Sequence, residues 1–296
     1  MNSTSRSSKN QQFTIKRENT LLNYLYAALS NESKTTVKSL LFHKQVRVNG
    51  RPTTQFDAPL KPGDLVEIYF DRNSVPFSHP MMKIIYEDDS LIVIEKASGL
   101  LSMANERERE HTAYHILNDY VKKSNPRGHV LIVHRLDRET SGIMVYAKTQ
   151  EVKEILQQNW DDVVLERKYV AVVEGQLSKE AGTFESYLME SKNTMVHSSR
   201  SSEEGKLAIT HYQTLKTGHN YSLLELDLAT GRKNQIRVHL KEAGHPVAGD
   251  KKYGATTNPL RRLALHAFKL RFIHPITRID MNFETPIPGN FKAITK

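Results

Sequence analysis

The stretch His134-Arg-Leu-Asp-Arg-Glu-Thr-Ser-Gly142 joins two apolar segments, residues 130–133 and 143–147, whose composition predicts β-strands. A loop between two strands can present a polar side chain at the edge of a sheet. Asp137 stands between two arginines in this loop, and neighbouring arginines favour the ionised form of a carboxylate. Such a carboxylate suits a nucleophile or a general base, but an Asp that only pairs with its neighbours in a turn would have the same local sequence.

The chain around this loop is richer in strands than in helices. Apolar patterning predicts further strands at residues 168–173, 209–215 and 221–228, and two more within residues 83–96 around an acidic turn. Helical spacing and end signals predict helices at residues 112–123, 149–160 and 234–243. We therefore expect an α+β domain with a mixed, largely antiparallel sheet and flanking helices.

Residues 13–72 have a different pattern. Apolar residues at helical spacing predict two short helices, and residues 45–50 predict a strand that ends in an Asn-Gly turn, with residues 65–70 as its partner. Basic side chains that could bind phosphate groups together lie around the second helix and the turn: Lys34, Lys38, Lys44, Arg47 and Arg51. With its VNG turn and its Lys61-Pro-Gly-Asp64 step, the segment resembles the small α/β S4 RNA-binding domain, which binds structured RNA. A solvated domain without a ligand is the alternative.

Two polar segments complete the domain organisation. Residues 1–12 are rich in Ser and Asn, which predicts a disordered tail. Residues 73–80 hold two prolines and two serines without periodicity, which predicts an interdomain linker. The expected order is the tail (1–12), the S4-like domain (13–72), the linker (73–80) and the α+β domain (81–296).

Composition narrows the classes of function. The 296 residues carry a net charge of +9, and residues 1–72 contribute +5 of it, with 11 Lys and Arg against 6 Asp and Glu, so we expect a polyanionic partner. The absence of cysteine excludes disulfides and thiolate chemistry, and the histidines lack ligand spacing, so we expect neither a metal nor a cofactor. No apolar run reaches the length of a membrane helix, which favours a cytoplasmic protein, and we expect a monomer.

The central stretch matches the HRLDxxTSG signature at every fixed position, so the chain resembles the RluA-type pseudouridine synthases. Four further segments of that family follow in order: Arg167-Lys-Tyr169, Thr230-Gly-Arg-Lys-Asn-Gln-Ile-Arg237, Gly249-Asp-Lys-Lys-Tyr-Gly254 and Leu265-His-Ala-Phe-Lys-Leu-Arg-Phe-Ile-His-Pro275. The resemblance spans residues 81–296.

This resemblance implies roles for single residues. Asp137 would be the catalytic carboxylate, and Arg237 the arginine that pairs with it. Tyr169 would stack on the target uracil and help at a proton transfer, Ile236 would line the pocket, and Arg135 would enter the RNA where the uridine leaves. Read without the resemblance, Tyr169 and Ile236 could be plain core residues and Arg237 a surface charge.

The implied activity is an isomerisation of uridine in RNA, in which the N1–C1′ bond breaks and C5 joins the same sugar carbon. The enzyme must take the base out of its stack and shield it from water. Asp137 could add to C6, act at C1′ or remove the 2′ proton, and the sequence does not choose among these steps.

The resemblance also bears on the substrate. Relatives with an N-terminal S4 domain commonly modify large-subunit ribosomal RNA, which makes ribosomal RNA the expected substrate and tRNA the alternative. A catalytically inactive RNA-binding assembly factor and a base-excising glycosidase are the rival classes.

Two segments depart from the family pattern, at three positions. Relatives usually read KPAG where this chain has Lys96-Ala-Ser-Gly99, and TGRxHQIR where this chain has Asn234. We expect changed local packing or contacts and retained activity, with neither segment touching the proposed catalytic groups through these departures.

Overall fold

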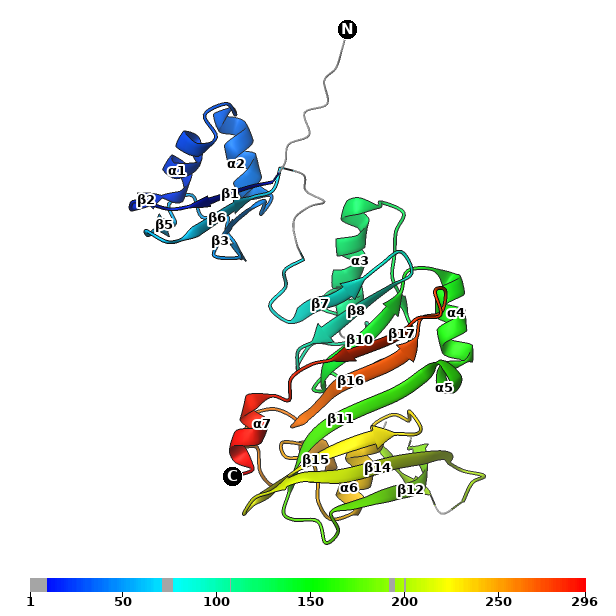
Figure 1. Ribbon diagram of the computed structural model, residues 1–296. Coiled ribbons are helices and arrows are strands. Elements are labelled where there is room, and N and C mark those ends of the chain that lie inside the picture. The colour runs from blue at the N-terminus through cyan, green and yellow to red at the C-terminus, as the bar shows by residue number, and fades with distance from the viewer. Residues whose placement is uncertain (1–9, 71–76, 107, 192–194, 200) are drawn as a thin grey trace. The chain divides into compact units, whose positions relative to one another are not determined.

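The computed structural model describes residues 10–70, 77–106, 108–191, 195–199 and 201–296. The chain divides into two compact units, Met1–Ser78 and His79–Lys296, each with its own apolar core (Figure 1). Residues 1–9 of the expected tail and 73–76 of the expected linker lie outside the described residues.

The first unit combines two helices with short strands. Its helices are α1 (Leu21–Ala28) and α2 (Lys34–Phe42). Its four-stranded sheet has the order β1 (Gln11–Thr14), β6 (Leu65–Ile68), β3 (Val46–Val48) and β4 (Arg51–Pro52). Two further strands, β2 (Asn19–Thr20) and β5 (Pro59–Leu60), pair with each other. The helices form at the predicted places because their apolar stripes face the core, where Leu25 and Leu41 are fully buried. Ser33 starts α2, since its hydroxyl accepts a hydrogen bond of 3.0 Å from the Thr36 N–H.

The Asn-Gly turn joins β3 to β4. Asn49 and Gly50 have φ angles of 51° and 75°, the left-handed conformations that such a turn requires. β6 is the second antiparallel partner of β3, as predicted. One expectation was wrong: Gln11 and Gln12 were assigned to the disordered tail but lie in β1, because Phe13 packs on the core and β1 covers an edge of β6.

The second unit is built on one eleven-stranded sheet. Along the sheet the order is β13 (Val196–Ser199), β12 (Ala181–Glu190), β14 (Lys206–Thr217), β15 (Tyr221–Leu228), β11 (Val164–Glu174), β16 (Leu265–Ile273), β10 (Ser141–Ala147), β8 (Leu91–Lys96) and β7 (Met82–Glu87). Off this path, β17 (Asp280–Glu284) pairs with β16, and β9 (Leu131–Ile132) pairs with β10. β10 and β16 run parallel, and the other strand pairings of the described residues are antiparallel, which confirms a mixed, largely antiparallel sheet.

Helices flank this sheet, and three of them lie at the predicted places: α3 (Ala113–Ser124), α4 (Gln150–Gln158) and α6 (Gln235–Glu242). The short helices α5 (Trp160–Val163) and α7 (Gly289–Ile294) and the 3₁₀ helix η2 (Lys251–Tyr253) were not predicted as separate elements. Thr112 and Thr149 accept N-capping hydrogen bonds at the starts of α3 and α4. Asn159 separates α4 from α5, so the predicted helix over residues 149–160 is interrupted near its end. Among the described residues, no helix is long and apolar enough to cross a membrane.

A parallel seam between β10 and β16 joins the two parts of the sheet. Its register pairs Ser141 with His266 and Gly142 with Ala267. A Cβ atom on Gly142, whose φ is +124°, would lie 2.1 Å from the carbonyl oxygen of Ala267. Glycine is therefore required where the loop of residues 134–142 enters the sheet.

Candidate active site

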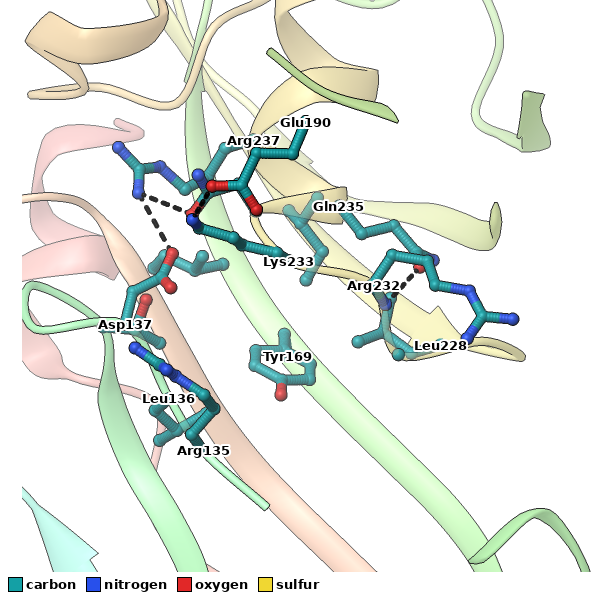
Figure 2. Close-up of a pocket in the computed structure, with 15 residues that line it drawn as sticks. Arg135, Leu136, Asp137, Tyr169, Glu190, Leu228, Arg232, Lys233, Gln235 and Arg237 are labelled. Carbon is teal, nitrogen blue, oxygen red and sulfur yellow. Dashed lines mark hydrogen bonds and ion pairs between the residues drawn. The ribbon is translucent and has the colours of Figure 1, made fainter. Parts of the chain in front are cut away.

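A pocket of about 420 Å³ lies between the loop of residues 134–142 and the start of α6 (Figure 2). The residues that line it come from segments far apart in the sequence: Arg135, Leu136, Asp137, Thr140, Tyr169, Glu190, Leu228, Gly231, Arg232, Lys233, Asn234, Gln235, Ile236, Arg237 and Leu265. The five site residues that the family resemblance implies therefore line one cavity: Arg135, Asp137, Tyr169, Ile236 and Arg237.

Asp137 and Arg237 meet at this pocket. Asp137 lies in the turn before β10, where its carbonyl accepts a hydrogen bond of 3.1 Å from the Thr140 N–H. Arg237 lies in the first turn of α6, and its Nη1 donates to Asp137 Oδ2 at 3.0 Å. The carboxylate is 28% exposed and the guanidinium side chain 12%, so the pair is open to the pocket and shielded behind.

Asp250 holds Arg237 from the opposite side. Its two carboxylate oxygens accept from Nε and Nη2 of Arg237 at 2.7 and 2.8 Å, which is a bidentate fork, and the carboxylate is almost fully buried. The guanidinium also lies over the ring of Tyr253 at 4.8 Å. Burial lowers the pKa of Arg237, but its hydrogen bonds and its attraction to Asp250 and Asp137 outweigh this and raise that pKa above its usual value.

Asp250 and Tyr253 were not among the predicted site residues. The signal was present, because both lie in the quoted segment Gly249-Asp-Lys-Lys-Tyr-Gly254. Their contact with Arg237 depends on how η2 folds back against α6, which the spacing of residues does not reveal.

Tyr169 and Ile236 form part of an apolar wall. Figure 2 shows the ring of Tyr169, which lies on β11, between the side of the pocket that carries Asp137 and the side of the pocket that carries Leu228. Ile236 is 4% exposed and packs in the core that surrounds α6. Burial raises the pKa of the Tyr169 hydroxyl to about 12, so this phenol is protonated at neutral pH.

Charged side chains surround the rim. Arg135 and Arg232 are exposed, and the Nε of Arg232 donates to the Leu207 carbonyl at 2.9 Å. Lys233 forms an ion pair with Glu190, from the end of β12 (Figure 2). The rim therefore carries more positive than negative charge, since Glu190 is its single carboxylate among the residues named, and positive charge of this kind attracts a phosphate backbone.

A buried lysine holds the loop that carries Asp137. Lys96 is fully buried, and its Nζ donates to the carbonyls of Ala97, Leu100 and Arg138 at 3.0, 2.7 and 3.1 Å. Ser98, one of the departures from the family pattern, adds a hydrogen bond of 2.7 Å to the Glu139 carbonyl. Burial lowers the pKa of Lys96 to about 7, against the attraction of the Glu139 and Asp137 carboxylates.

The other departure corrects an expectation. Asn234 was expected not to touch the proposed catalytic groups, but its Oδ1 accepts a hydrogen bond of 3.2 Å from Arg237 Nη1. The contact arises because Asn234 is the N-cap residue of α6, one turn before Arg237. His134, the histidine of the central stretch, contacts the backbone of β10, because its Nε2 accepts a hydrogen bond of 3.0 Å from the Val145 N–H.

The basic residues of the first unit differ in exposure. Lys34, Lys38 and Lys44, here called the lysine cluster, are exposed. Arg47 is only 8% exposed, its Nη1 donates to the Gly50 carbonyl at 3.1 Å, and its guanidinium lies 5.9 Å from the centre of the Tyr69 ring. This geometry gives Arg47 a part in holding the hairpin together, whereas the side chains of the lysine cluster are accessible to solvent.

The donor set around the pocket is one of arginines, a lysine, amides and two carboxylates. Within the described ranges no group of three or more His, Cys, Asp or Glu side chains is placed to hold a metal ion. The Asp137 carboxylate, oriented by Arg237 at the pocket, is suited to general acid–base or nucleophilic chemistry.

The profile of the family described as RNA pseudouridylate synthase matches residues 90–242. The chain belongs to this family, and it is an RNA pseudouridine synthase, an isomerase.

Individual relatives extend the match over most of the chain. The sequence is 33% identical over 269 residues to the uncharacterized RNA pseudouridine synthase YhcT of Bacillus subtilis. The matched region covers 89% of this chain and 88% of that protein. It is 32% identical over 285 residues to the ribosomal large subunit pseudouridine synthase D of Haemophilus influenzae, with coverage of 88% and 85%. Among solved structures, human RNA pseudouridylate synthase domain containing 4 is similar with a TM-score of 0.58 at 25% identity, over 71% of this chain and 90% of that one.

Proposed function

We propose that this RNA pseudouridine synthase isomerises uridines in large-subunit ribosomal RNA, with Asp137 as its catalytic carboxylate. The observation that carries the proposal is the Asp137–Arg237 pair, at 3.0 Å, beside a pocket of about 420 Å³ with an apolar wall. A pocket of this volume suits a single base that has been taken out of the RNA stack.

The pair leaves Asp137 able to react. Arg237 occupies Oδ2, and Oδ1 accepts no hydrogen bond from the described part of the chain. A fixed guanidinium orients the carboxylate and limits its rotation, so that one oxygen faces the pocket. Each of the three steps open to Asp137 needs an oriented carboxylate of this kind.

Tyr169 and Ile236 are proposed to hold the uracil while it is detached. The Tyr169 ring offers a face for stacking, and the apolar wall disfavours water that could trap the sugar carbon. When C5 bonds to C1′, the C5 proton leaves and N1 gains a proton, so substrate and product have the same composition. The protonated Tyr169 hydroxyl is suited to a part in this exchange.

The remaining contacts are proposed for the RNA backbone. Arg135 is exposed at the rim, where it could enter the gap that the uridine leaves. The lysine cluster and the S4-like character of residues 13–72 support docking of structured RNA by the first unit. The relatives named for the large ribosomal subunit favour ribosomal RNA over tRNA. A cytoplasmic location and a monomeric state go with this proposal.

Tritium release tests the activity. Purified protein is incubated with ribosomal RNA and, separately, tRNA that carry 5-tritiated uridine, and we expect release from ribosomal RNA as pseudouridine forms. Release from tRNA alone would make tRNA the substrate, free uracil would indicate a glycosidase, and no release with retained RNA binding would indicate an assembly factor.

Asp137→Asn tests the proposed carboxylate. This variant keeps the size of the side chain but removes its charge, so we expect kcat to fall by about 10³-fold or more with an unchanged circular dichroism spectrum. Glu139→Gln makes the same chemical change on an exposed side chain of the same loop and should keep wild-type kcat. An Asp137→Asn enzyme that still isomerises RNA at the wild-type rate would refute the mechanism.

A further inference from the structure

Asn234 has an unusual backbone conformation at the start of α6. Its φ and ψ angles are 54° and 18°, in the left-handed region that asparagine tolerates better than most residues. An N-cap asparagine usually accepts a hydrogen bond from an N–H of its own helix, but the Asn234 side chain makes no such bond. The side chain is thereby available for contacts elsewhere.

The amide of Asn234 bridges two residues of the site. Its Nδ2 donates to the Tyr253 hydroxyl at 2.8 Å, and its Oδ1 accepts from Arg237 Nη1 at 3.2 Å. Because a guanidinium can only donate, the atom that faces Arg237 must be the oxygen, which fixes the orientation of the amide. Asn234 is 9% exposed, so little water competes for these contacts.

The hydrogen bonds of Arg237 show what this bridge contributes. Nε and Nη2 donate to Asp250, which fixes the plane of the guanidinium. Nη1 donates both to Asp137 Oδ2 and to Asn234 Oδ1. Asn234 therefore holds the same nitrogen that pairs with Asp137, and a second acceptor on Nη1 limits the rotation that would turn this group away from the carboxylate.

We propose that Asn234 is a positioning residue for pseudouridine formation, whose amide is anchored on Tyr253 and directs the Arg237 guanidinium toward Asp137. The inference rests on the proposed roles of Asp137 and Arg237. Asn234 acts through Arg237 and need not touch the RNA, so its removal should slow the chemical step and leave RNA binding almost unchanged.

Two substitutions separate the side chain from the backbone. Asn234→Gly removes the amide and still permits the positive φ, whereas Asn234→Ala removes the amide and strains the backbone. We expect kcat to fall about 10-fold in both variants and KM to change by less than about twofold. Only the alanine variant should also show a clearly lowered Tm.

A double-mutant cycle tests the anchor. Tyr253→Phe keeps the ring beneath Arg237 and removes the hydroxyl, and its loss of kcat should resemble that of Asn234→Gly. Because Asn234→Gly removes the amide and Tyr253→Phe removes the hydroxyl that anchors it, both changes break the same contact, and the double variant should lose no more than either single one. Additive losses, or a Gly variant with wild-type kcat or with an effect on KM alone, would overturn the inference. A wild-type enzyme that releases no tritium would instead refute the proposed function.

Discussion

At the scale of single residues, Lys96 shows how the loop of Asp137 is held. Its ammonium group has three N–H bonds, and the carbonyls of Ala97, Leu100 and Arg138 accept one each. One side chain thus connects the loop after β8 with the loop before β10. Removing it would leave the buried Leu100 carbonyl and the two partly buried carbonyls of Ala97 and Arg138 without this donor, which costs free energy of folding.

Lys96→Met should change how stability depends on pH. Folding lowers the pKa of Lys96 from 10.5 to about 7, so between these values the unfolded chain binds a proton that the folded chain does not. The free energy of unfolding should therefore rise with pH across this window, by up to about 1.4 kcal/mol per pH unit. In Lys96→Met this contribution is absent, and urea unfolding at several pH values would reveal the flatter slope.

The control is a lysine on the neighbouring strand. Lys83 is exposed in β7, so Lys83→Met should keep the wild-type slope. Identical slopes in the wild type and Lys96→Met would contradict the linkage.

The sequence predicted some residues of the site and not others. Asp137 and Arg237 were found because each lies in a motif whose pattern identifies it, although 100 residues separate them. The role of Asp250 was not found, because its contact with Arg237 depends on the packing of η2 against α6, and no local pattern contains that tertiary information. The contact between Asn234 and Arg237 lies within one helical turn, but it depends on the left-handed backbone of Asn234, which directs the amide away from an ordinary N-cap hydrogen bond.

At the scale of elements, Gly142 controls the seam between β10 and β16. Gly142→Ala would place a methyl group 2.1 Å from the Ala267 carbonyl oxygen, so the strands would have to separate beside the loop that carries Asp137. We expect a loss of about 3 kcal/mol or more in the free energy of unfolding, together with a loss of activity. Chemical denaturation and tritium release would measure the two effects.

Gly244→Ala is the matched control for this change. Gly244 follows α6 with a φ of +83°, but a Cβ there meets no atom within 4 Å. Gly244→Ala should lower the free energy of unfolding only through backbone strain, by about 1 to 2 kcal/mol, and should retain activity. Equal losses in both variants would show that the conformation of Gly142, and not the close approach of β16, is what matters.

The prediction of elements succeeded where one face is apolar. The apolar stripes of α1, α2 and α4 can be recognised in the sequence. So can β10, whose apolar run is buried along its whole length. β12 and β13 were not predicted, because β12 is half exposed along its length and carries Glu, Ser and Gly among its apolar residues. β16 was recognised as a family motif without being assigned as a strand.

At the scale of the whole molecule, the lysine cluster tests how the first unit takes part. Replacing its three lysines by alanine in the full chain should raise KM for structured RNA and leave kcat nearly unchanged. Each lost phosphate contact should reduce the slope of log affinity against log salt by about 0.7 to 0.9, or about 2 to 3 in total. RNA binding at several salt concentrations would measure that slope.

The control removes the same charge elsewhere. Lys123, Lys179 and Lys292 are exposed lysines of the second unit, away from the residues that line the pocket. Their replacement by alanine should reduce affinity much less. Equal losses would mean that total charge, and not the position of the lysine cluster, governs RNA binding.

The seam between β10 and β16 also bears on how such an enzyme can evolve. Asp137 precedes β10, whereas Arg237 lies on α6, whose Ile236 and Leu240 belong to the core beside β11 and β15. Two backbone pairs, Ser141 with His266 and Gly142 with Ala267, connect these parts of the sheet. β16 contributes side chains to this core and to the core beside β10, so the spacing of acid and arginine is inherited only while those two pairs and the packing of the shared strand persist.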